Sequence, residues 1–355
     1  MSRYAYMRTI EVGILGGTGM VGQHFIRFLQ GHPWFKLTWL GASDRSAGKK
    51  LKEAAGWRLE GEMPPDAAEM VVSDSKPGHA PRLVFSAMDA SVATEIEREF
   101  AGAGHIVVSN SRNHRMEPDV PLIVPEVNPG HLSLLAFQQQ NRRWPGMIVT
   151  NPNCSTVVLS MALAPLTQFG IERVIAATMQ AISGAGYPGV PSMDIVGNVI
   201  PYIGSEEEKM QQETQKILGT IENGMTAPLK ARVSAHCHRV AVVDGHTVAA
   251  SVELSSGPKI EDIQSAMENF CGIPQQRGLP SAPLKPIICM REQDRPQPRR
   301  DAGRENGMAV FVGRIRECPV LNVKFVACGH NTIRGAAGAA VLNAELMVSE
   351  GLLDS

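Results

Sequence analysis

The chain has 355 residues, of which 43% are hydrophobic and 19% charged, and it carries 34 basic against 35 acidic side chains. This composition indicates a globular protein with enough apolar residues for two domains, and it argues against disorder. A formal net charge of −1 offers no polycationic surface for nucleic acid or for an anionic membrane. Small-molecule ligands remain, including small anions held by local arginines.

The cysteines and the apolar runs predict the compartment. Six cysteines are spread along the chain without a Cys-x-x-Cys pair or a His/Cys cluster at zinc-finger spacing, so we expect neither a disulfide framework nor a bound metal. No apolar stretch reaches the ~18 residues that a membrane span needs. Met1–Arg8 lacks the apolar core of a secretion signal. We therefore expect a cytoplasmic protein.

The first 150 residues alternate short apolar runs with helical patterns. Ile10–Leu15 predicts a strand, the glycine-rich Gly16–Gly22 a turn, and Gln23–Pro33 a helix. Further elements are predicted as strands at Leu37–Leu40, Leu83–Phe85 and Ile106–Val108, and as a helix at Val92–Phe100. Strands that alternate with helices predict an α/β fold with a doubly wound parallel sheet, a Rossmann-like domain over residues 1–150.

The pattern changes after about residue 150. Strand-like runs at His246–Leu254, Met308–Arg314 and Asn322–Ala327 have few helices between them, which predicts a largely antiparallel α+β domain over residues 151–330. The charged, proline-interrupted Arg291–Asn306 is typical of a surface loop or of an excursion from the second domain. The alanine-rich Asn331–Val348 predicts a helix that packs back, so that residues 331–355 complete the first domain.

The glycine-rich turn is a candidate nucleotide site. Gly17, Gly19 and Gly22 satisfy the spacing G-x-G-x-x-G directly after a strand and at the head of a helix. Backbone can approach a pyrophosphate closely there, and the helix N-terminus favours negative charge. The alternative is a turn that serves only tight packing. We predict a dinucleotide cofactor held by Gly16, Thr18, Gly19, Met20 and Val21.

Cofactor choice is expected to depend on the segment after the second strand, ASDRSAGKK. Asp44 would suit a ribose hydroxyl, as in NAD binders, whereas Ser43, Arg45 and Ser46 would hold a 2′-phosphate. The alternative is a solvated turn without a ligand. We predict NADP.

The segment TNPNCST places Cys154 at the mouth of an apolar run. Pro152 ends extended structure and Ser155–Leu163 predicts a helix, so the thiol lies in the first helical turn, where the helix dipole is expected to lower its pKa. A small buried residue at a helix start is the alternative. A nucleophilic cysteine needs an acid/base partner, and the candidates His236, His238 and His246 stand together before or on a later strand.

Several blocks in the same order resemble the aspartate-semialdehyde dehydrogenases, in the branch found in archaea and fungi. These blocks are GGTGMVG, TNPNCST, MQAISGAGYPG, GSEEEKMQQETQKIL, RVAVVDGHT, RPQPR and HNTIRGAAGAA. The resemblance implies reduction of an acyl phosphate with NADPH through a cysteine thioester, in lysine, threonine and methionine biosynthesis. It also implies a homodimer or a homotetramer.

The resemblance assigns the central residues one at a time. Cys154 matches the nucleophile, with Asn153 beside it, and Gln180 matches the glutamine that orients the substrate. The family's acid/base histidine stands seven residues after an arginine, which implies His246 and Arg239. Arg239 is then expected to clamp the α-carboxylate. His236 and His238 lie on the wrong side of that arginine.

Further residues follow from the same comparison. Glu206 and Lys209 match residues that meet the substrate amine and phosphate, although without the family an ordinary solvated helix face is preferred. Arg115 matches a phosphate-binding arginine, with Arg112 as its rival. The residues expected to approach the cofactor are Ser86, Ser183, Gly184 and Asn331.

One departure and three alternatives accompany this interpretation. Ala241 replaces an expected proline, which removes a φ restraint but no functional group. The same branch includes enzymes that resemble malonyl-CoA reductase, and N-acetyl-glutamyl-phosphate reductase follows similar logic. A nucleotide-binding regulatory protein with a structural Cys154 keeps the fold without the chemistry.

Overall fold

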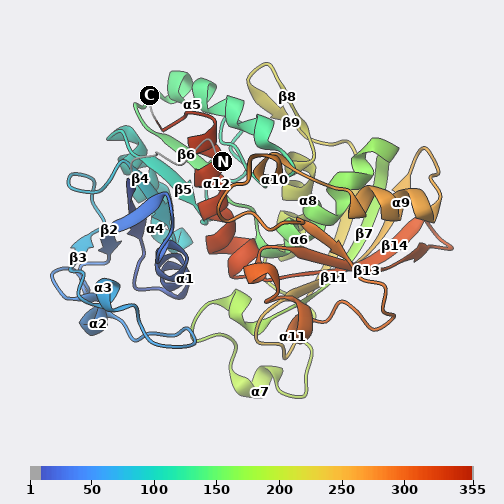
Figure 1. The fold of residues 1–355 in the computed structure, drawn as a ribbon, viewed down its shortest axis with the longest axis horizontal. Coiled ribbons are helices and arrows are strands. Elements are labelled where there is room, and N and C mark those ends of the chain that lie inside the picture. Colours follow the sequence, from blue (N-terminus) through green and yellow to red (C-terminus); the bar gives the residue numbers. More distant parts are fainter. Residues whose placement is uncertain (1–8, 354–355) are drawn as a thin grey trace.

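The structure, a computed structural model, describes residues 9–353. The expectation that Met1–Arg8 is not a secretion signal therefore lies outside the described residues. Two six-stranded sheets form the frame. Figure 1 shows the first sheet on the left and the second on the right, with helix α12 (Gly338–Ser349) between them. The arrangement places the ends of several strands near the centre of the molecule.

The first sheet is entirely parallel, in the order β3-β2-β1-β4-β5-β6. Its strands are β1 Ile10–Leu15, β2 Phe35–Ala42, β3 Val72–Asp74, β4 Leu83–Ser86, β5 Ile106–Ser109 and β6 Met147–Thr150. The strand order reverses between β1 and β4, and in such sheets a ligand crevice opens outside the carboxyl ends at that point. The predicted Rossmann-like sheet is confirmed.

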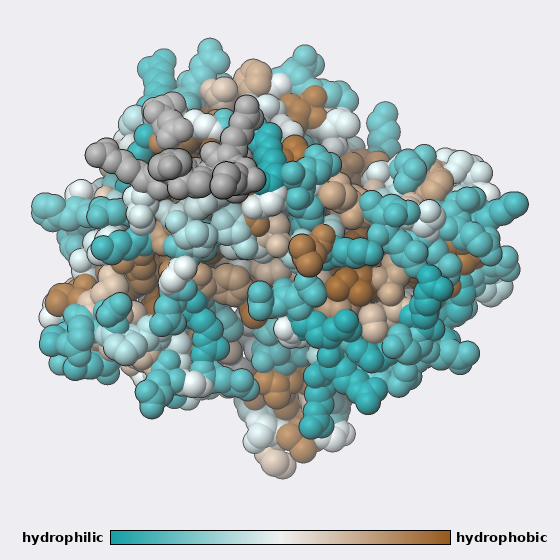
Figure 2. Space-filling view, viewed as in Figure 1, coloured by the Kyte–Doolittle hydropathy of each residue, from teal (hydrophilic) through white to brown (hydrophobic). Residues whose placement is uncertain are grey.

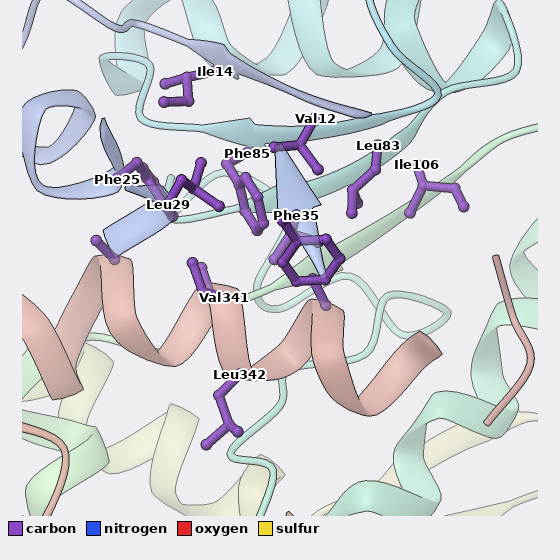
Figure 3. Packing of buried hydrophobic residues seen from close by; sticks show 14 of the residues in the cluster. Val12, Ile14, Phe25, Leu29, Phe35, Leu83, Phe85, Ile106, Val341 and Leu342 are labelled. Atoms are coloured by element: carbon purple, nitrogen blue, oxygen red, sulfur yellow. The ribbon is translucent and has the colours of Figure 1, made fainter. Parts of the chain in front are cut away.

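Helices cover both faces of this sheet. Helix α1 (Met20–Leu29) and α12 pack on one face and α4 (Ala90–Gly102) on the other. Phe25 stacks on Phe85 at 5.0 Å between ring centroids, and Figure 3 shows Val341 pointing from α12 toward the strands. Every residue of α12 except Ser349 is buried, including the polar Asn343 and Glu345, which agrees with its mostly apolar sequence. The remaining helices here are α2 Leu51–Ala54, α3 Pro65–Ala68 and α5 Leu134–Arg142.

The second sheet is mixed, in the order β10-β7-β11-β14-β13-β12. Its strands are β7 Ile171–Gln180, β10 Arg232–Arg239, β11 His246–Leu254, β12 Ile287–Cys289, β13 Val310–Glu317 and β14 Val323–Gly329. β11 pairs antiparallel with β7 and β14, as β13 does with β14, but β7–β10 and β12–β13 are parallel. The expected largely antiparallel sheet is therefore right only for the central strands, because apolar runs predict strands but not their partners.

One face of the mixed sheet is covered by α6 (Cys154–Leu163), α8 (Glu206–Ile217) and α9 (Ile260–Glu268). The opposite face leaves Ile175 and Met179 exposed. Peripheral elements are α7 Ser192–Ile195, β8 Thr220–Glu222, β9 Met225–Ala227, α10 Ile273–Arg277 and α11 Pro298–Asp301. Within residues 9–353, no helix combines the length and apolarity of a membrane span.

The segment Arg291–Asn306 is largely exposed, as predicted, but it has a buried anchor. It contains α11, and Asp301 at the end of that helix is fully buried. The Asp301 carboxylate accepts hydrogen bonds from Arg295 Nε at 2.8 Å and from the Gln297 N–H at 2.7 Å. Charge and proline content do not reveal this anchor, because it forms only when the segment folds on its own carboxylate.

A buried ion pair joins the segment after β5 to the turn before α12. Arg334 Nη1 lies 2.8 Å from Glu126 Oε1, Nη2 lies 2.5 Å from Oε2, and both side chains have no solvent exposure. Gln275 donates to the same carboxylate at 3.4 Å. A charge in such a place is tolerated only with its partner.

Glu126→Gln should destabilise the protein by about 3–5 kcal/mol, because it leaves the Arg334 guanidinium buried without a counter-charge. Urea unfolding followed by circular dichroism measures this change. Glu253→Gln is the matched control, since its ion pair with Arg173 lies on the surface and should matter little. Equal unfolding midpoints for Glu126→Gln and the wild type would contradict the account.

Candidate active site

Cys154 is the first residue of α6, as the sequence predicts. Asn153 caps the helix, since its side-chain Oδ1 accepts from the Ser155 N–H at 3.0 Å and from the Thr156 N–H at 3.3 Å. A capping asparagine satisfies donors that the first helical turn leaves unpaired. The cap therefore fixes where the helix starts and where the thiol points.

His246 is the histidine that the structure brings to the thiol. It begins β11, and its Nε2 lies 3.1 Å from Cys154 Sγ. His236 and His238 lie on β10 instead: His236 is exposed near Glu207, and His238 Nδ1 bonds the Thr178 carbonyl. The arrangement matches the register that the family resemblance implies.

The tautomer of His246 follows from its second nitrogen. The Ala181 N–H donates to Nδ1 at 3.1 Å, so the neutral ring carries its proton on Nε2 and directs it to Cys154 Sγ. This Nε2–H stabilises negative charge on sulfur or on an oxygen bound beside it. A complete proton transfer through His246 requires that Nδ1 release the Ala181 N–H.

The predicted lowering of the Cys154 pKa is wrong for the free site. Burial raises the pKa of this thiol to about 12, with a further contribution from Glu206, and these outweigh Arg115, Arg239 and the Ser155 N–H, which lower it. Burial also lowers the pKa of His246 to about 3, assisted by the nearby Arg239 and His330. The free site therefore holds a neutral thiol beside a neutral imidazole.

The carboxylate of Glu206 contacts the side-chain amides of the capping residue and of Gln180. Glu206 is buried, and its Oε2 accepts from Asn153 Nδ2 at 2.7 Å and from Gln180 Nε2 at 3.4 Å. Its Oε1 accepts from Lys209 Nζ at 3.0 Å. Glu206 and Lys209 therefore belong to the same cluster as the thiol, and the solvated helix face is excluded for Glu206.

Arg239 is the last residue of β10 and lies close to His246. Its Nη1 donates to the Ala181 carbonyl at 2.7 Å, and the side chain is largely buried. A Cβ added to Gly184 would lie 2.8 Å from this Nη1 and 3.0 Å from His246 Cε1. Glycine at position 184 therefore permits the loop after β7 to approach both side chains.

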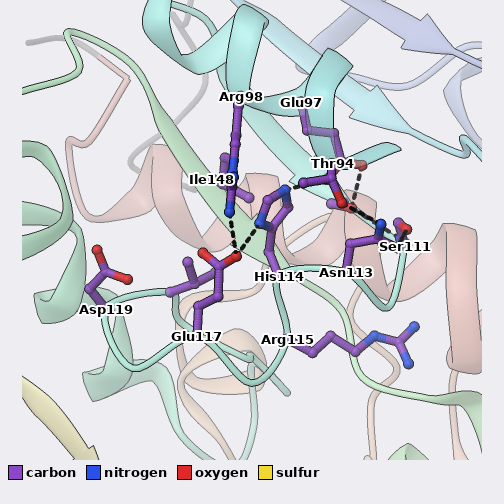
Figure 4. Close-up of polar contacts among 12 residues, drawn as sticks. Thr94, Glu97, Arg98, Ser111, Asn113, His114, Arg115, Glu117, Asp119 and Ile148 are labelled. Carbon is purple, nitrogen blue, oxygen red and sulfur yellow. Dashed lines mark hydrogen bonds and ion pairs between the residues drawn. The ribbon is translucent and has the colours of Figure 1, made fainter. Parts of the chain in front are cut away.

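Arg115 faces the cluster and Arg112 does not. Arg115 is buried, donates to Glu213 Oε1 at 3.0 Å and to the Asn110 carbonyl at 2.7 Å, and contributes to the electrostatics of Cys154. Figure 4 shows its side chain pointing away from His114. Arg112 is exposed. The geometry favours Arg115 over its rival.

The glycine turn lies at the reversal point of the parallel sheet. Gly16 has φ +77°, and a Cβ there would lie 2.7 Å from the Ala87 carbonyl oxygen. A Cβ at Gly22 would lie 2.3 Å from the Gly16 oxygen, so both glycines are required for the strand-to-helix turn. Gly19 is the N-cap of α1, and Thr18, Met20 and Val21 surround this partly exposed helix start.

The other predicted cofactor residues divide into two groups. Ser43 and Arg45 are exposed and Ser46 half-buried just after β2, at the same sheet edge as the glycine turn. Ser86 ends β4, but its hydroxyl is buried and donates to Glu97 at 2.6 Å, so this side chain already has a protein partner.

Asn331 holds two loops together near the histidine. Its Nδ2 donates to Ser183 Oγ at 2.8 Å, and its Oδ1 accepts from the Gly245 N–H at 2.8 Å. Gly245 directly precedes His246. Asn331 therefore connects the loop after β7 with the residue that begins β11.

Comparison with known proteins identifies the family of this chain. Residues 11–135 match the family described as "Semialdehyde dehydrogenase, NAD binding domain" and residues 163–334 match "Semialdehyde dehydrogenase, dimerisation domain". An aspartate-semialdehyde dehydrogenase from Methanothermobacter thermautotrophicus is 51% identical over 95% of this chain and 99% of its own. The Saccharomyces cerevisiae relative of the same name is 45% identical over 96% and 98%. The chain belongs to the aspartate-semialdehyde dehydrogenase family.

Solved structures agree with this membership. An aspartate-semialdehyde dehydrogenase from Candida albicans, solved with NADP, superposes with a TM-score of 0.91 at 42% identity, over 97% of this chain and 99% of that one. A second enzyme of the family, from Vibrio cholerae, gives 0.75 at 29% identity, over 96% and 99%. The family resemblance of the sequence motifs is therefore confirmed.

Sequence reasoning missed two residues of this aspartate-semialdehyde dehydrogenase site. A Cβ at Gly335 would lie 2.5 Å from Cys154 Cβ, so the turn before α12 can pack on the nucleophile only with glycine there. Glu213 accepts hydrogen bonds from Arg115 and from the Asn153 N–H. Both residues lie in the quoted blocks, but a block match does not say which residue touches the thiol.

Alkylation of Cys154 by iodoacetamide in the free protein should accelerate by about tenfold per pH unit between pH 6 and pH 9, because only the thiolate reacts and the raised pKa keeps it scarce. Mass spectrometry of the Cys154 peptide at each pH measures the rate and separates this thiol from the other cysteines. A rate that stays constant from pH 6 to pH 9 would indicate an imidazolium–thiolate pair and contradict the neutral state.

Proposed function

We propose that this chain catalyses the NADPH-dependent reductive dephosphorylation of L-4-aspartyl phosphate to L-aspartate 4-semialdehyde, on the route to lysine, threonine and methionine. The observation that carries the proposal is the contact of 3.1 Å between Cys154 Sγ and His246 Nε2, with Arg115 and Arg239 close to the thiol. Relatives named aspartate-semialdehyde dehydrogenase, and the Candida albicans structure with NADP, support it.

The reaction needs a nucleophile and a place for the leaving charge. The Cys154 sulfur attacks the acyl carbon while the carbon–oxygen bond to phosphate breaks. The thiol proton leaves with the phosphate, so inorganic phosphate departs and a thioester remains on Cys154. NADPH, when bound, supplies the hydride that reduces this thioester. The His246 Nε2–H is placed to stabilise charge on the substrate oxygen, and the aldehyde leaves as the thiol is restored.

The roles of the binding residues follow from charge. Arg239 holds the substrate α-carboxylate, and Arg115 and Lys209 hold phosphate. Glu206 meets the substrate amine, and Gln180 with Asn153 orients the acyl group. Because Glu206 and Lys209 pair with each other at 3.0 Å, bound substrate exchanges this internal pair for contacts of its own.

The cofactor lies, in this proposal, across the switch point between β1 and β4. Gly16, Gly19 and the start of α1 receive the pyrophosphate. Ser43, Arg45 and Ser46 would hold the 2′-phosphate, and Ser183, Gly184 and Asn331 would contact the cofactor from the other side of the site. Ser86 contributes through its backbone, since its hydroxyl is bonded to Glu97.

We also propose the division into a cofactor domain of residues 1–150, completed by 331–355, and a catalytic domain of residues 151–330, in a cytoplasmic protein. A homodimer is favoured over a homotetramer as the minimal assembly. Ile175 and Met179 are exposed on the open face of the mixed sheet, and Met193 and Val196 are exposed at the tip that Figure 2 shows as hydrophobic, where α7 lies. The match to a dimerisation domain supports a dimer.

Oxidation of L-aspartate semialdehyde by NADP⁺ should require phosphate, because phosphate releases the acyl group from Cys154. The rate of NADP⁺ reduction, followed by nicotinamide absorbance with and without phosphate, measures this requirement.

Cys154→Ala should abolish turnover and retain NADPH binding, and His246→Asn should lower the rate by about 10²–10⁴-fold. Reduction of malonyl-CoA at a rate that matches or exceeds that of aspartyl phosphate would overturn the substrate assignment. NADPH binding without any turnover would favour a regulatory protein.

Arg45→Ala should reduce the preference for NADP over NAD by about 10- to 100-fold, because a charge-assisted hydrogen bond to the 2′-phosphate is lost. The ratio of kcat/KM for the two cofactors measures the change. Lys49→Ala in the same turn serves as the control for general loss of positive charge. Equal kinetics with NAD and NADP in the unsubstituted enzyme would contradict this assignment.

A further inference from the structure

The carboxylate of Glu213, in the middle of α8, touches both halves of the proposed site. Its Oε1 accepts from Arg115 Nη1 at 3.0 Å, and its Oε2 accepts from the backbone N–H of Asn153 at 2.6 Å. The side chain is almost completely buried, with 1% of its surface exposed. One group therefore bridges a candidate phosphate-binding cation and the residue that caps the nucleophile's helix.

Other carboxylates near Arg115 have partners of their own, and Glu97 accepts from Ser86 and Ser109. Glu117 and Asp119 pair with Arg142, and Glu117 also contacts His114 at 2.9 Å. Figure 4 shows Arg115 directed away from these two acids. Among the ion pairs of the described residues, Glu213 is the carboxylate bonded to Arg115.

Helix α8 also holds the main chain of Arg115. Lys216, one turn after Glu213, donates from Nζ to the carbonyls of Arg115, Glu117 and Val120 at 2.7–2.8 Å. The guanidinium and the backbone of Arg115 are thus held by two residues of the same helix. This fixes Arg115 relative to α8, and Glu213 in turn fixes α8 relative to Asn153.

The Arg115 guanidinium is held in place, but not all of its N–H donors have an acceptor. Its Nη2 donates to the Asn110 carbonyl, and its Nη1 donates to Glu213, while its Nε is buried without a partner among the described residues. A buried donor without an acceptor is costly unless a ligand uses it. The guanidinium is therefore pre-oriented with donor capacity left for an anion.

We propose that Glu213 is a positioning residue, which fixes the distance between the phosphate held by Arg115 and the sulfur of Cys154. This inference rests on the proposed function, because the step that needs it forms the carbon–sulfur bond while the carbon–oxygen bond to phosphate breaks. Both reacting ends are then held through one carboxylate. A displacement of about 1 Å in such a geometry costs about 100-fold in rate.

Glu213→Gln separates the two contacts. The amide oxygen still accepts from the Asn153 N–H, but the amide nitrogen is a donor and cannot receive Arg115 Nη1. In the phosphate-dependent oxidation of aspartate semialdehyde, this variant should raise the KM for phosphate by about 10- to 100-fold and lower kcat. The KM for the aldehyde should change little.

Four further variants make the test specific. Glu208→Gln alters an exposed carboxylate of the same helix and should behave as the wild type. Arg115→Ala should raise the KM for phosphate, and adding Glu213→Gln to it should cause no further rise, because the carboxylate acts through the arginine. Glu213→Asp keeps the charge with a shorter reach and should recover part of the phosphate affinity, and it replaces Glu213→Gln if the amide variant does not fold.

The outcomes distinguish this inference from the proposed function. If the wild type shows no phosphate-dependent oxidation, the proposed function fails, and Glu213 has no such step to position. If the wild type is active and Glu213→Gln lowers only the melting temperature, or adds its full effect to Arg115→Ala, Glu213 is merely structural and the inference is overturned.

Discussion

The start of helix α6 is the constraint on which the site depends. Asn153 caps the helix with its side chain and donates its backbone N–H to Glu213, so Cys154 has one position at the first helical turn. From that position the sulfur lies 3.1 Å from His246 Nε2. Gly335 and Gly184 allow two other segments to approach the pair closely. The cap thus fixes the position of the thiol relative to the residues around it.

Burial and charge act against each other around this centre. Desolvation raises the pKa of Cys154 and lowers that of His246, so the free pair is neutral. Arg115 and Arg239 oppose this effect on the thiol, although burial outweighs them. The same two cations are the ones that we propose to hold the phosphate and the carboxylate of the substrate.

The sequence predicts the elements of this site better than its contacts. Strand, glycine turn and helix between Ile10 and Leu29 are local patterns, and the structure confirms them. The contact of Glu213 with Arg115 spans 98 positions, and no periodicity records it. Nor does position at a helix start reveal that the surroundings of the partly buried Cys154 raise its pKa, because that effect depends on residues distant in the sequence. Parallel pairing of β7 with β10 likewise depends on chain path.

The central claim is that Cys154 forms a covalent aspartyl thioester. Intact-protein mass spectrometry tests it directly, after mixing the enzyme with L-aspartate semialdehyde and NADP⁺ in the absence of phosphate, where the acyl group has no acceptor other than water. The account predicts a mass increase of one aspartyl group, located on the Cys154 peptide, absent in Cys154→Ala and lost when phosphate is added. An unmodified Cys154 after reduction of one equivalent of NADP⁺, or the acyl group on another residue, would contradict it.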